Sequence, residues 1–241
     1  MMEAAWDKAG DARRQQIESG SDLTFCKVFV PYYVELVVRL KPASLLEVGC
    51  GTGHLSARLA EYVPTVVAIE PSHGMYEIAL QTLANRGVIV RNRTVQDYDD
   101  DICFDLIISH MCVQVVADLD VFLSGVARHM SGQSVLILVL PHPCFYNDYK
   151  EFFTSEEYEY MKESRKLVSF TITKEPGTRI SNVPYSHRPL SQYFSCLRDH
   201  DLLLTDFVEV YPEPEIEALY GTPWGVPRYC IMYAEKRSKG E

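Results

Sequence analysis

The sequence predicts an α/β fold built on a doubly wound parallel sheet. Two observations support this prediction. Apolar runs alternate with amphipathic stretches from residue 44 to residue 140, and the run SVLILVL at 134–140 is apolar almost throughout. A strand that is apolar on both faces is typical of a parallel sheet with helices on both sides. The 241 residues, of which 47% are hydrophobic, are enough for a single domain over residues 1–241.

Each element follows from the spacing of its apolar residues and from the residues that bound it. In the segment 25–40 apolar residues recur at helical spacing, and Lys41 and Pro42 end the pattern. Residues 1–40 are therefore expected to form an N-terminal helical cover. Strands are predicted at 44–48, 65–69, 88–91, 104–109, 134–140, 202–210 and 229–235, and further helices at 55–62, 74–85, 119–129 and 188–200.

The segment 141–188 interrupts this alternation. It is rich in Tyr, Phe, Glu and Lys, contains Pro176 and Gly177, and has one strand-like run at 167–174. Ligands of open α/β sheets bind beyond the carboxyl ends of the strands, and this segment follows the fifth strand at that edge. We therefore expect a lid insertion that covers the substrate. Its aromatic residues either line a flat substrate or form a small core of the lid itself.

Composition and charge disfavour several classes of protein. Lys and Arg number 23 against 33 Asp and Glu, a net charge of −10, which disfavours nucleic acid as a partner. The seven cysteines are scattered without a CxxC pair, so neither a disulfide framework nor a bound metal is expected. The N-terminus has no signal-peptide pattern, and no apolar run approaches the roughly 20 residues that span a bilayer. We expect a cytoplasmic protein with no membrane contact, and its oligomeric state stays open.

A glycine-rich loop follows the first predicted strand. In LLEVGCGTGHL, residues 45–55, three glycines alternate with other residues. The dinucleotide fingerprint GxGxxG requires a third glycine where this chain has His54, which disfavours a nicotinamide-dependent oxidoreductase. Glu47, two residues before the first glycine, would repel a pyrophosphate. It can instead bind a cationic ammonium group or a loop amide, while N–H groups at the start of the next helix remain available for a carboxylate.

Two further loops at strand ends carry polar groups suited to adenosine. Glu70 ends the second predicted strand, and its carboxylate can accept hydrogen bonds from both ribose hydroxyls. The loop VQDYD at 95–99 follows the third strand. Asp97 in this loop can accept a hydrogen bond from the adenine amino group, with Gln96 or Tyr98 alongside.

Taken in order, LLEVGCGTGHL, IEPS at 69–72, VQDYD and FDLIISH at 104–110 resemble the motifs of class I S-adenosylmethionine-dependent methyltransferases. The resemblance implies a Rossmann-like sheet of seven strands, mostly parallel with the last strand antiparallel. It also implies S-adenosylmethionine as the methyl donor and S-adenosylhomocysteine as the product. The donor-binding residues expected from the motifs and the resemblance together are Glu47, Gly49, Cys50, Gly51, Gly53, Glu70, Pro71, Met75, Gln96, Asp97, Tyr98 and Ser109.

A second resemblance concerns the acceptor. PHPCFY at 141–146 and YSHRPLSQYFSCLRDHDL at 185–202 are similar to segments of bacterial small-molecule methyltransferases of this class. The implied function is methyl transfer to nitrogen or oxygen of a small molecule. The alternatives are a protein methyltransferase and a catalytically silent module that binds the donor.

Methyl transfer is an in-line attack on the S-methyl carbon of a sulfonium, so the protein mainly aligns the partners and excludes water. A general base is needed only when the nucleophile arrives protonated. His110 and His142, which follow the fourth and fifth predicted strands, are the candidate catalytic residues, and His187 is a third candidate.

Overall fold

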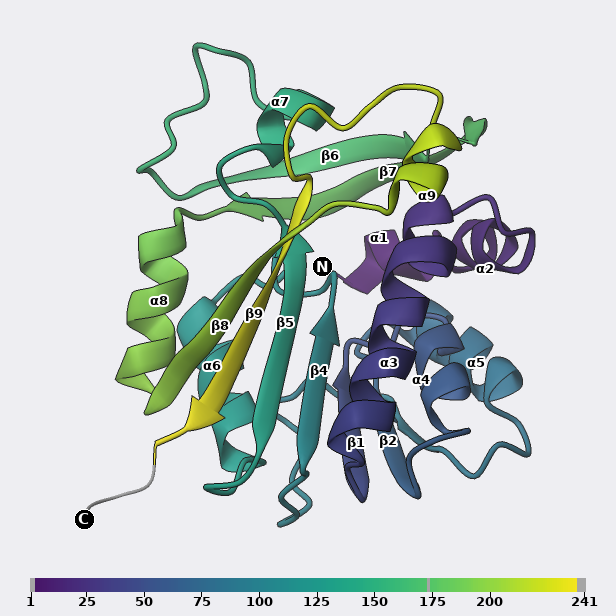
Figure 1. Cartoon of the computed structure of the whole chain (residues 1–241), viewed down its shortest axis with the longest axis vertical. Coiled ribbons are helices and arrows are strands. Elements are labelled where there is room, and N and C mark those ends of the chain that lie inside the picture. Colours follow the sequence, from purple (N-terminus) through teal and green to yellow (C-terminus); the bar gives the residue numbers. More distant parts are fainter. Residues whose placement is uncertain (1–2, 173, 238–241) are drawn as a thin grey trace.

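A seven-stranded sheet forms the centre of the molecule in this computed structural model, which describes residues 3–172 and 174–237 (Figure 1). The strand order is β3-β2-β1-β4-β5-β9-β8, and every neighbouring pair is parallel except those of β9, which runs antiparallel to β5 and β8. The strands are β1 (Ser44–Val48), β2 (Thr65–Ile69), β3 (Ile89–Arg91), β4 (Leu106–His110), β5 (Val135–Pro141), β8 (Leu202–Val210) and β9 (Tyr229–Lys236). The predicted doubly wound sheet with an antiparallel last strand is confirmed.

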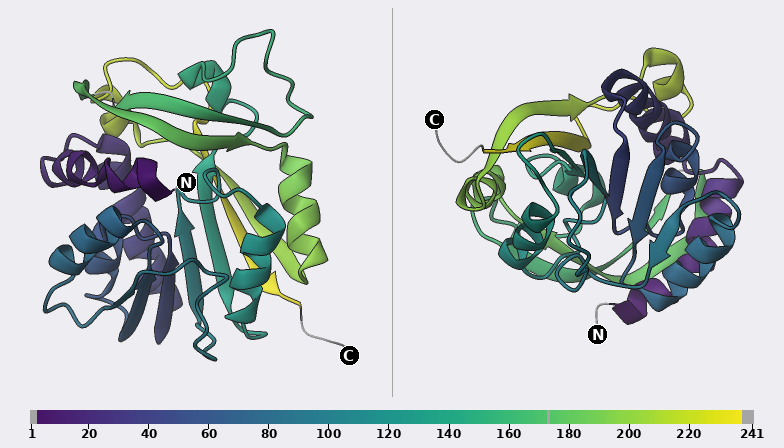
Figure 2. Two further views of the ribbon diagram at one scale, coloured as in Figure 1. Left: turned by 180° about the vertical axis from the view of Figure 1, so that it is seen from behind. Right: turned by 90° about the horizontal axis from the view of Figure 1, so that it is seen from below.

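Helices cover both faces of the sheet because successive strand residues point to opposite sides. Leu45 packs into the cluster that contains side chains of α3 and α4, while Leu46 packs with side chains of α6 and α8. The two pairs of helices lie on opposite faces of the sheet (Figure 2). The bounds of these helices are α3 (Val30–Leu40), α4 (His54–Leu59), α6 (Leu119–Arg128) and α8 (Leu190–Asp199). A further helix, α5 (His73–Thr82), lies beside α4. Among the described residues, no helix combines the length and the apolar character that a membrane span requires.

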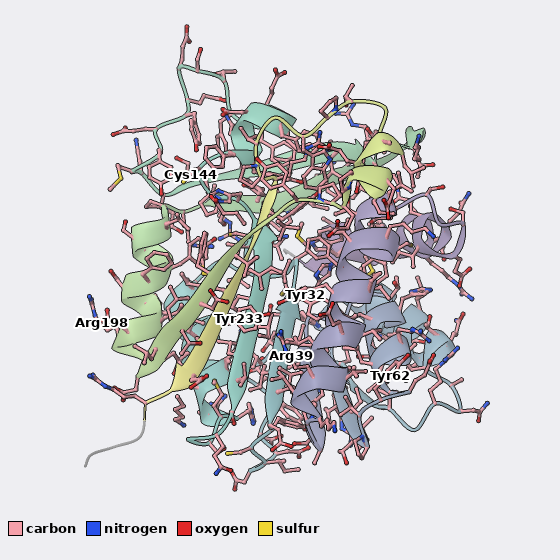
Figure 3. All side chains as sticks on the ribbon, in the orientation of Figure 1. Tyr32, Arg39, Tyr62, Cys144, Arg198 and Tyr233 are labelled. Atoms are coloured by element: carbon pink, nitrogen blue, oxygen red, sulfur yellow. The ribbon has the colours of Figure 1, made fainter. Side chains whose placement is uncertain are left out.

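Helix α3 is tied to its face of the sheet by a pair of tyrosines. Tyr32 of α3 and Tyr233 of β9 point toward each other, and their hydroxyl groups form a hydrogen bond (Figure 3). Burial raises the pKa of the Tyr32 hydroxyl. The pair is therefore a neutral polar contact between the helix and the sheet.

The N-terminal cover consists of α1 (Glu3–Asp7), α2 (Gly10–Glu18) and a π-helical turn, η1 (Thr24–Phe29), that continues into α3. Residues 1 and 2 of the predicted cover lie outside the described part. Asp7 accepts hydrogen bonds from the Ser72 hydroxyl at 2.6 Å and from the Gly74 N–H at 3.0 Å. A Cβ at Gly74 would lie 2.4 Å from the Asp7 carbonyl oxygen. The cover thus docks on the first turn of α5, which leaves room there for glycine alone.

The lid is a two-stranded antiparallel sheet of β6 (Ser164–Ile172) and β7 (Glu175–His187), preceded by α7 (Tyr146–Lys150). It crosses above the carboxyl ends of the central strands, beside α9 (Pro214–Ala218) (Figure 1). The predicted strand 167–174 overlaps β6, which begins earlier, at Ser164, and ends at Ile172. Lys174 lies in the following turn, and residue 173 lies outside the described residues. The sequence pattern does not predict β7, because its Pro and Gly residues are typical of turns rather than of strands.

A buried arginine joins the lid to the body of the molecule. Arg188, between β7 and α8, is 1% exposed. Its guanidinium donates to Glu163 Oε1 at 2.8 Å and to the carbonyls of Val113, Val116 and Ala117 at 3.3, 2.8 and 3.1 Å. A buried guanidinium is tolerated when its donors are paired in this way. The contacts fix the loop after β4 against the start of α8.

Candidate active site

The carboxyl ends of the parallel strands open into a cavity of about 470 Å³. It lies where the strand order reverses between β1 and β4, the position at which open α/β sheets bind ligands. Its floor comes from the ends of β1, β2 and β4, and its roof comes from the lid and the N-terminal cover. Its volume falls within the range of roughly 300–1,000 Å³ that is usual for small-molecule sites.

The glycine-rich loop forms one wall of this cavity. The backbone is left-handed at Gly49 (φ +75°) and at Gly51 (φ +54°), conformations that favour glycine. A Cβ at Gly49 would lie 2.6 Å from the Cys112 Sγ, so the loop can pass this close to the chain after β4 only without a side chain. At Gly51 no atom lies within 4 Å of the equivalent position. The loop therefore leaves open space at Gly51, where a ligand can approach the backbone.

Glu70 is buried at the edge of this loop. Its two oxygens accept hydrogen bonds from the N–H groups of Gly51 and Ser72, both at 2.8 Å. Asn92 supports the position by donating to the carbonyls of Glu70 and Pro71 at 2.7 and 3.0 Å. Burial raises the pKa of Glu70 to about 7, against the lowering effect of these two N–H donors. A carboxylate can accept further hydrogen bonds on its remaining lone pairs, so the geometry suits the predicted ribose contact.

Glu47 lies deeper in the same wall. Burial raises its pKa to about 8, and the Ser56 hydroxyl donates a hydrogen bond to its Oε2. At neutral pH the carboxyl group is therefore largely protonated, since a buried charge without a cationic partner is costly. A cationic ligand group would supply that partner, which agrees with the ammonium contact predicted from the sequence.

The predicted donor-binding residues divide into two groups. Eight line the cavity: Glu47, Gly49, Cys50, Gly51, Glu70, Pro71, Met75 and Gln96. Gly53, Asp97, Tyr98 and Ser109 do not. Gly53 forms the N-cap of α4, while Asp97 accepts from the Thr94 hydroxyl at 2.5 Å within its own loop. Tyr98 packs against His129, and Ser109 is fully buried in β4 between side chains that face the other way.

Two acidic residues of the N-terminal cover have structural roles that the sequence pattern does not predict. Asp7 docks on α5, as described above. Asp22 lines the cavity, accepts from Arg13 Nη2 at 2.8 Å, and caps the following helix by accepting from the Phe25 N–H at 3.0 Å. The available signal was an aspartate three residues before a predicted helix, a common N-cap pattern. The docking of Asp7 has no local signal, because its partners are more than sixty residues away.

The three candidate histidines have different surroundings. His110 is the last residue of β4 and lines the cavity, whereas the predicted strand ended one residue earlier. His142 does not line the cavity: its Nε2 is 3.1 Å from Glu209 Oε1, and its Nδ1 accepts from the Cys144 N–H at 3.2 Å. His187 is also outside it, with Nε2 2.8 Å from the Tyr160 carbonyl. The structure thus brings His110, and neither of the others, to the cavity.

Aromatic rings surround His110. Phe29 meets its ring edge-on at a centroid distance of 4.8 Å, Phe25 lies at 5.8 Å, and the Tyr33 hydroxyl is 3.4 Å from His110 Nδ1. The imidazole faces the cavity rather than open solvent, and this desolvation lowers its pKa to about 3. His110 is therefore neutral at physiological pH, and it is a weak base.

We use the term aromatic chamber for the part of the cavity beyond His110. Its rings come from the cover, the lid, the loop before β9 and the first residue of β9, and they are Phe25, Phe29, Tyr146, Phe152, Tyr185, Tyr220 and Tyr229. Neighbouring rings lie at contact distance, with centroids 5.4 Å apart for Phe29 and Tyr229 and 5.0 Å for Phe152 and Tyr185. The chamber presents flat apolar walls next to the glycine-rich loop and to the carboxyl groups of Glu47 and Glu70.

Comparison with known proteins identifies the central part of the chain. Residues 46–138 match the family described as "Methyltransferase domain". The match covers less than half of the chain, and it shows that this segment is similar to methyltransferase domains. The chain is 30% identical over 95 residues to the malonyl-(acyl-carrier protein) O-methyltransferase of Bacillus cytotoxicus, a match that covers 39% of this chain and 33% of that protein. The chain thus spans about a third of the length of the curated relatives it matches.

Solved structures show that the methyltransferase fold extends beyond this segment. An S-adenosylmethionine-dependent methyltransferase described as putative, from Listeria monocytogenes, has a TM-score of 0.61 at 20% identity, covering 84% of this chain and 98% of that one. The 1,6-didemethyltoxoflavin-N1-methyltransferase of Burkholderia thailandensis, solved with 1,6-didemethyltoxoflavin and S-adenosylhomocysteine bound, has a TM-score of 0.59 at 16% identity. That match covers 95% of this chain and 87% of that one. These likenesses show that the chain shares the fold of these proteins.

Replacing Glu70 tests the predicted ribose contact. In Glu70→Gln, the affinity for S-adenosylhomocysteine is expected to fall by about 2 kcal/mol, roughly 30-fold, because a charge-assisted acceptor becomes an amide with one acceptor oxygen. Isothermal titration calorimetry measures the loss. Glu77→Gln, on the exposed side of α5, is the matched control and should bind as the wild type does. Equal affinities of the two variants would contradict the assignment of Glu70 to the donor.

The raised pKa of Glu47 predicts a pH-dependent stability. The folded protein holds this proton up to about pH 8, whereas an unfolded chain loses it near pH 4.5, so the free energy of unfolding falls as the pH rises between these values. From pH 6 to pH 8 the wild type should lose about 2 kcal/mol relative to Glu47→Gln, which carries no such proton. Urea unfolding of both proteins at each pH measures the difference. A difference independent of pH would show that Glu47 is ionised in the free protein.

Proposed function

We propose that the protein is an enzyme that transfers a methyl group from S-adenosylmethionine to nitrogen or oxygen of a small, flat acceptor. The observation that carries the proposal is the continuity of the cavity. The same 470 Å³ space is lined by Glu47, Gly51 and Glu70 at one end and by the aromatic chamber at the other. A donor held by the first group would present its methyl group to an acceptor held by the second.

The chamber favours a small acceptor over a protein or nucleic acid. Its walls are aromatic and come from segments that enclose the space, namely the cover, the lid, the loop before β9 and the start of β9. Burial of a flat apolar ligand between these walls contributes favourable binding free energy, and each ring contact adds roughly 0.5–1.5 kcal/mol. The small-molecule acceptor bound to the structurally similar Burkholderia enzyme is consistent with this choice.

The donor, when bound, supplies an already activated methyl group on a sulfonium. The chain's own residues then hold the donor, align the acceptor with it and shield both from water. Glu70 and the Gly51 backbone position the donor end, while the lid and cover exclude water from the space between donor and acceptor. Phe25 and Phe29 hold the ring of His110 beside the chamber, so that it limits where an acceptor can lie.

His110 takes a positioning role in this mechanism. With a pKa of about 3, its imidazole is a weak proton acceptor near neutral pH, where an efficient general base has a pKa close to the operating pH. The nucleophile is therefore expected to enter the transfer step as a neutral amine or as an already deprotonated oxygen. Its proton, where one remains, leaves to solvent after transfer.

Binding and turnover experiments test the proposed function. S-adenosylhomocysteine should bind with micromolar affinity in calorimetry, and NAD(H) should give no binding heat. The protein should then form S-adenosylhomocysteine from S-adenosylmethionine when flat amines, phenols or aromatic carboxylic acids are supplied, above the rate without acceptor. Binding of NAD(H) in place of the donor would refute the donor assignment. Methylation of a peptide library alone would move the acceptor to the protein class, and donor binding without any turnover would identify a silent module.

The variant His110→Asn separates alignment from general base catalysis. If His110 positions the acceptor, the single-turnover rate should fall by less than about 10-fold, since general base catalysis contributes roughly 10²–10⁴-fold. Rapid-quench measurement with saturating donor gives this rate, and calorimetry verifies that donor affinity is unchanged. His73→Asn, exposed on α5, is the matched control. A loss of 100-fold or more at unchanged donor affinity would restore His110 as the base.

A further inference from the structure

Three potential metal ligands meet between helices α6 and α8, outside the cavity. Asp120 lies in the first turn of α6, Cys196 in the last turn of α8, and His200 directly after that helix. One carboxylate oxygen, the Sγ and one imidazole nitrogen all lie within 4.8 Å of one another. His200 Nε2 is 2.9 Å from Asp120 Oδ1. None of the three residues lines the cavity, so the cluster is separate from the proposed active site.

Contacts within and between α6 and α8 position these three side chains. Cys196 and His200 are four residues apart, a spacing that puts both on the same side of a helix end. The His200 N–H donates to the Leu197 carbonyl at 3.1 Å, which fixes the backbone at the end of α8. Asp120 is placed by the start of α6, where the Asp118 side chain caps the helix by accepting from the Val121 N–H at 3.1 Å. The two helices pack on the same face of the sheet through the buried cluster that includes Leu123 and Leu197.

We propose that Asp120, Cys196 and His200 form a zinc site, with water as the fourth ligand. One thiolate, one imidazole and one carboxylate are the ligand types that Zn²⁺ takes, and the thiolate disfavours Mg²⁺ and Ca²⁺. The negative charges of the thiolate and carboxylate together cancel the charge of the dication. The Asp120 side chain is 71% exposed and that of His200 is 18% exposed, so the site has an open side for water.

The present geometry is close to the geometry that the metal requires. Two ligand atoms bonded to a tetrahedral zinc at about 2.0–2.1 Å lie about 3.3 Å apart, against 2.9 Å for His200 Nε2 and Asp120 Oδ1. On binding, zinc replaces this hydrogen bond: Nε2 presents its lone pair to the metal, and the imidazole proton resides on Nδ1. The Cys196 thiol loses its proton to solvent as the zinc–sulfur bond forms.

The site would clamp the second end of α8. Arg188 already holds the first end to the carbonyls of the loop that precedes α6. A metal at Asp120 would tie the other end of α8 to the first turn of α6, whose residues Val121 and Phe122 line the cavity. Zinc is therefore expected to stabilise the folded protein by binding it in preference to the unfolded chain.

Cobalt serves as a visible probe for the site. The full-length protein is treated with a chelator, dialysed and titrated with Co²⁺, which gives a thiolate charge-transfer band and intense visible bands in a tetrahedral thiolate site. We expect saturation at one equivalent, displacement by Zn²⁺, and loss of the charge-transfer band in Cys196→Ser. The apparent affinity should fall at least 10-fold in Asp120→Asn and in His200→Asn. Cys103→Ser, which removes an exposed cysteine elsewhere, should behave as the wild type does.

Site-resolved alkylation tests the same proposal without any substitution. Mass spectrometry of the wild type should show that Zn²⁺ slows the modification of Cys196 at least 10-fold and leaves that of Cys103 unchanged. The proposal is overturned if the charge-transfer band is absent from the wild type or persists in Cys196→Ser. Equal alkylation of Cys196 with and without Zn²⁺ would also overturn it, and would leave Asp120 and His200 as a plain surface ion pair. None of these readouts depends on methyltransferase activity.

Discussion

One buried guanidinium joins the lid, which forms part of the roof of the cavity, to the loop that follows β4. Arg188 stands where the lid strand β7 passes into α8, and its donors reach the loop after β4 as well as Glu163 of the lid. The neighbouring Ser186 adds a backbone hydrogen bond to the Gln114 carbonyl at 2.7 Å. Residues of this loop line the cavity, so the lid and the donor site are positioned by the same contacts. A buried charge with several acceptors fixes a geometry more sharply than apolar packing would, since each acceptor is costly to leave unpaired.

The donor end of the cavity carries a different constraint, because two carboxyl groups are buried where a free charge is unfavourable. The pKa values of Glu47 and Glu70 are raised to about 8 and about 7, so the free protein keeps much of this end neutral. A cationic ligand offsets the cost of ionising them.

The features of the fold that depend on local pattern could be predicted from the sequence. The seven central strands follow from apolar or strand-like runs, and the acid Glu70 follows from its place at the end of β2. Features that depend on contacts with another segment of the chain could not be predicted. Strand β7 exists because it pairs with β6, although its own residues favour turns. His142 follows the expected strand, yet its side chain turns toward Glu209, and this direction is set by packing rather than by sequence position.

The same distinction explains why the donor is easier to identify than the acceptor. The matched domain, residues 46–138, contains the glycine-rich loop, Glu47 and Glu70. Every ring of the aromatic chamber lies outside it, in the cover, the lid, the loop before β9 or the start of β9. His110 stands at the boundary between the two, inside the matched domain and against the rings of η1. The rings that would meet an acceptor therefore belong to segments outside the matched domain, and Arg188 and the N-terminal contacts bring these segments over the strand ends.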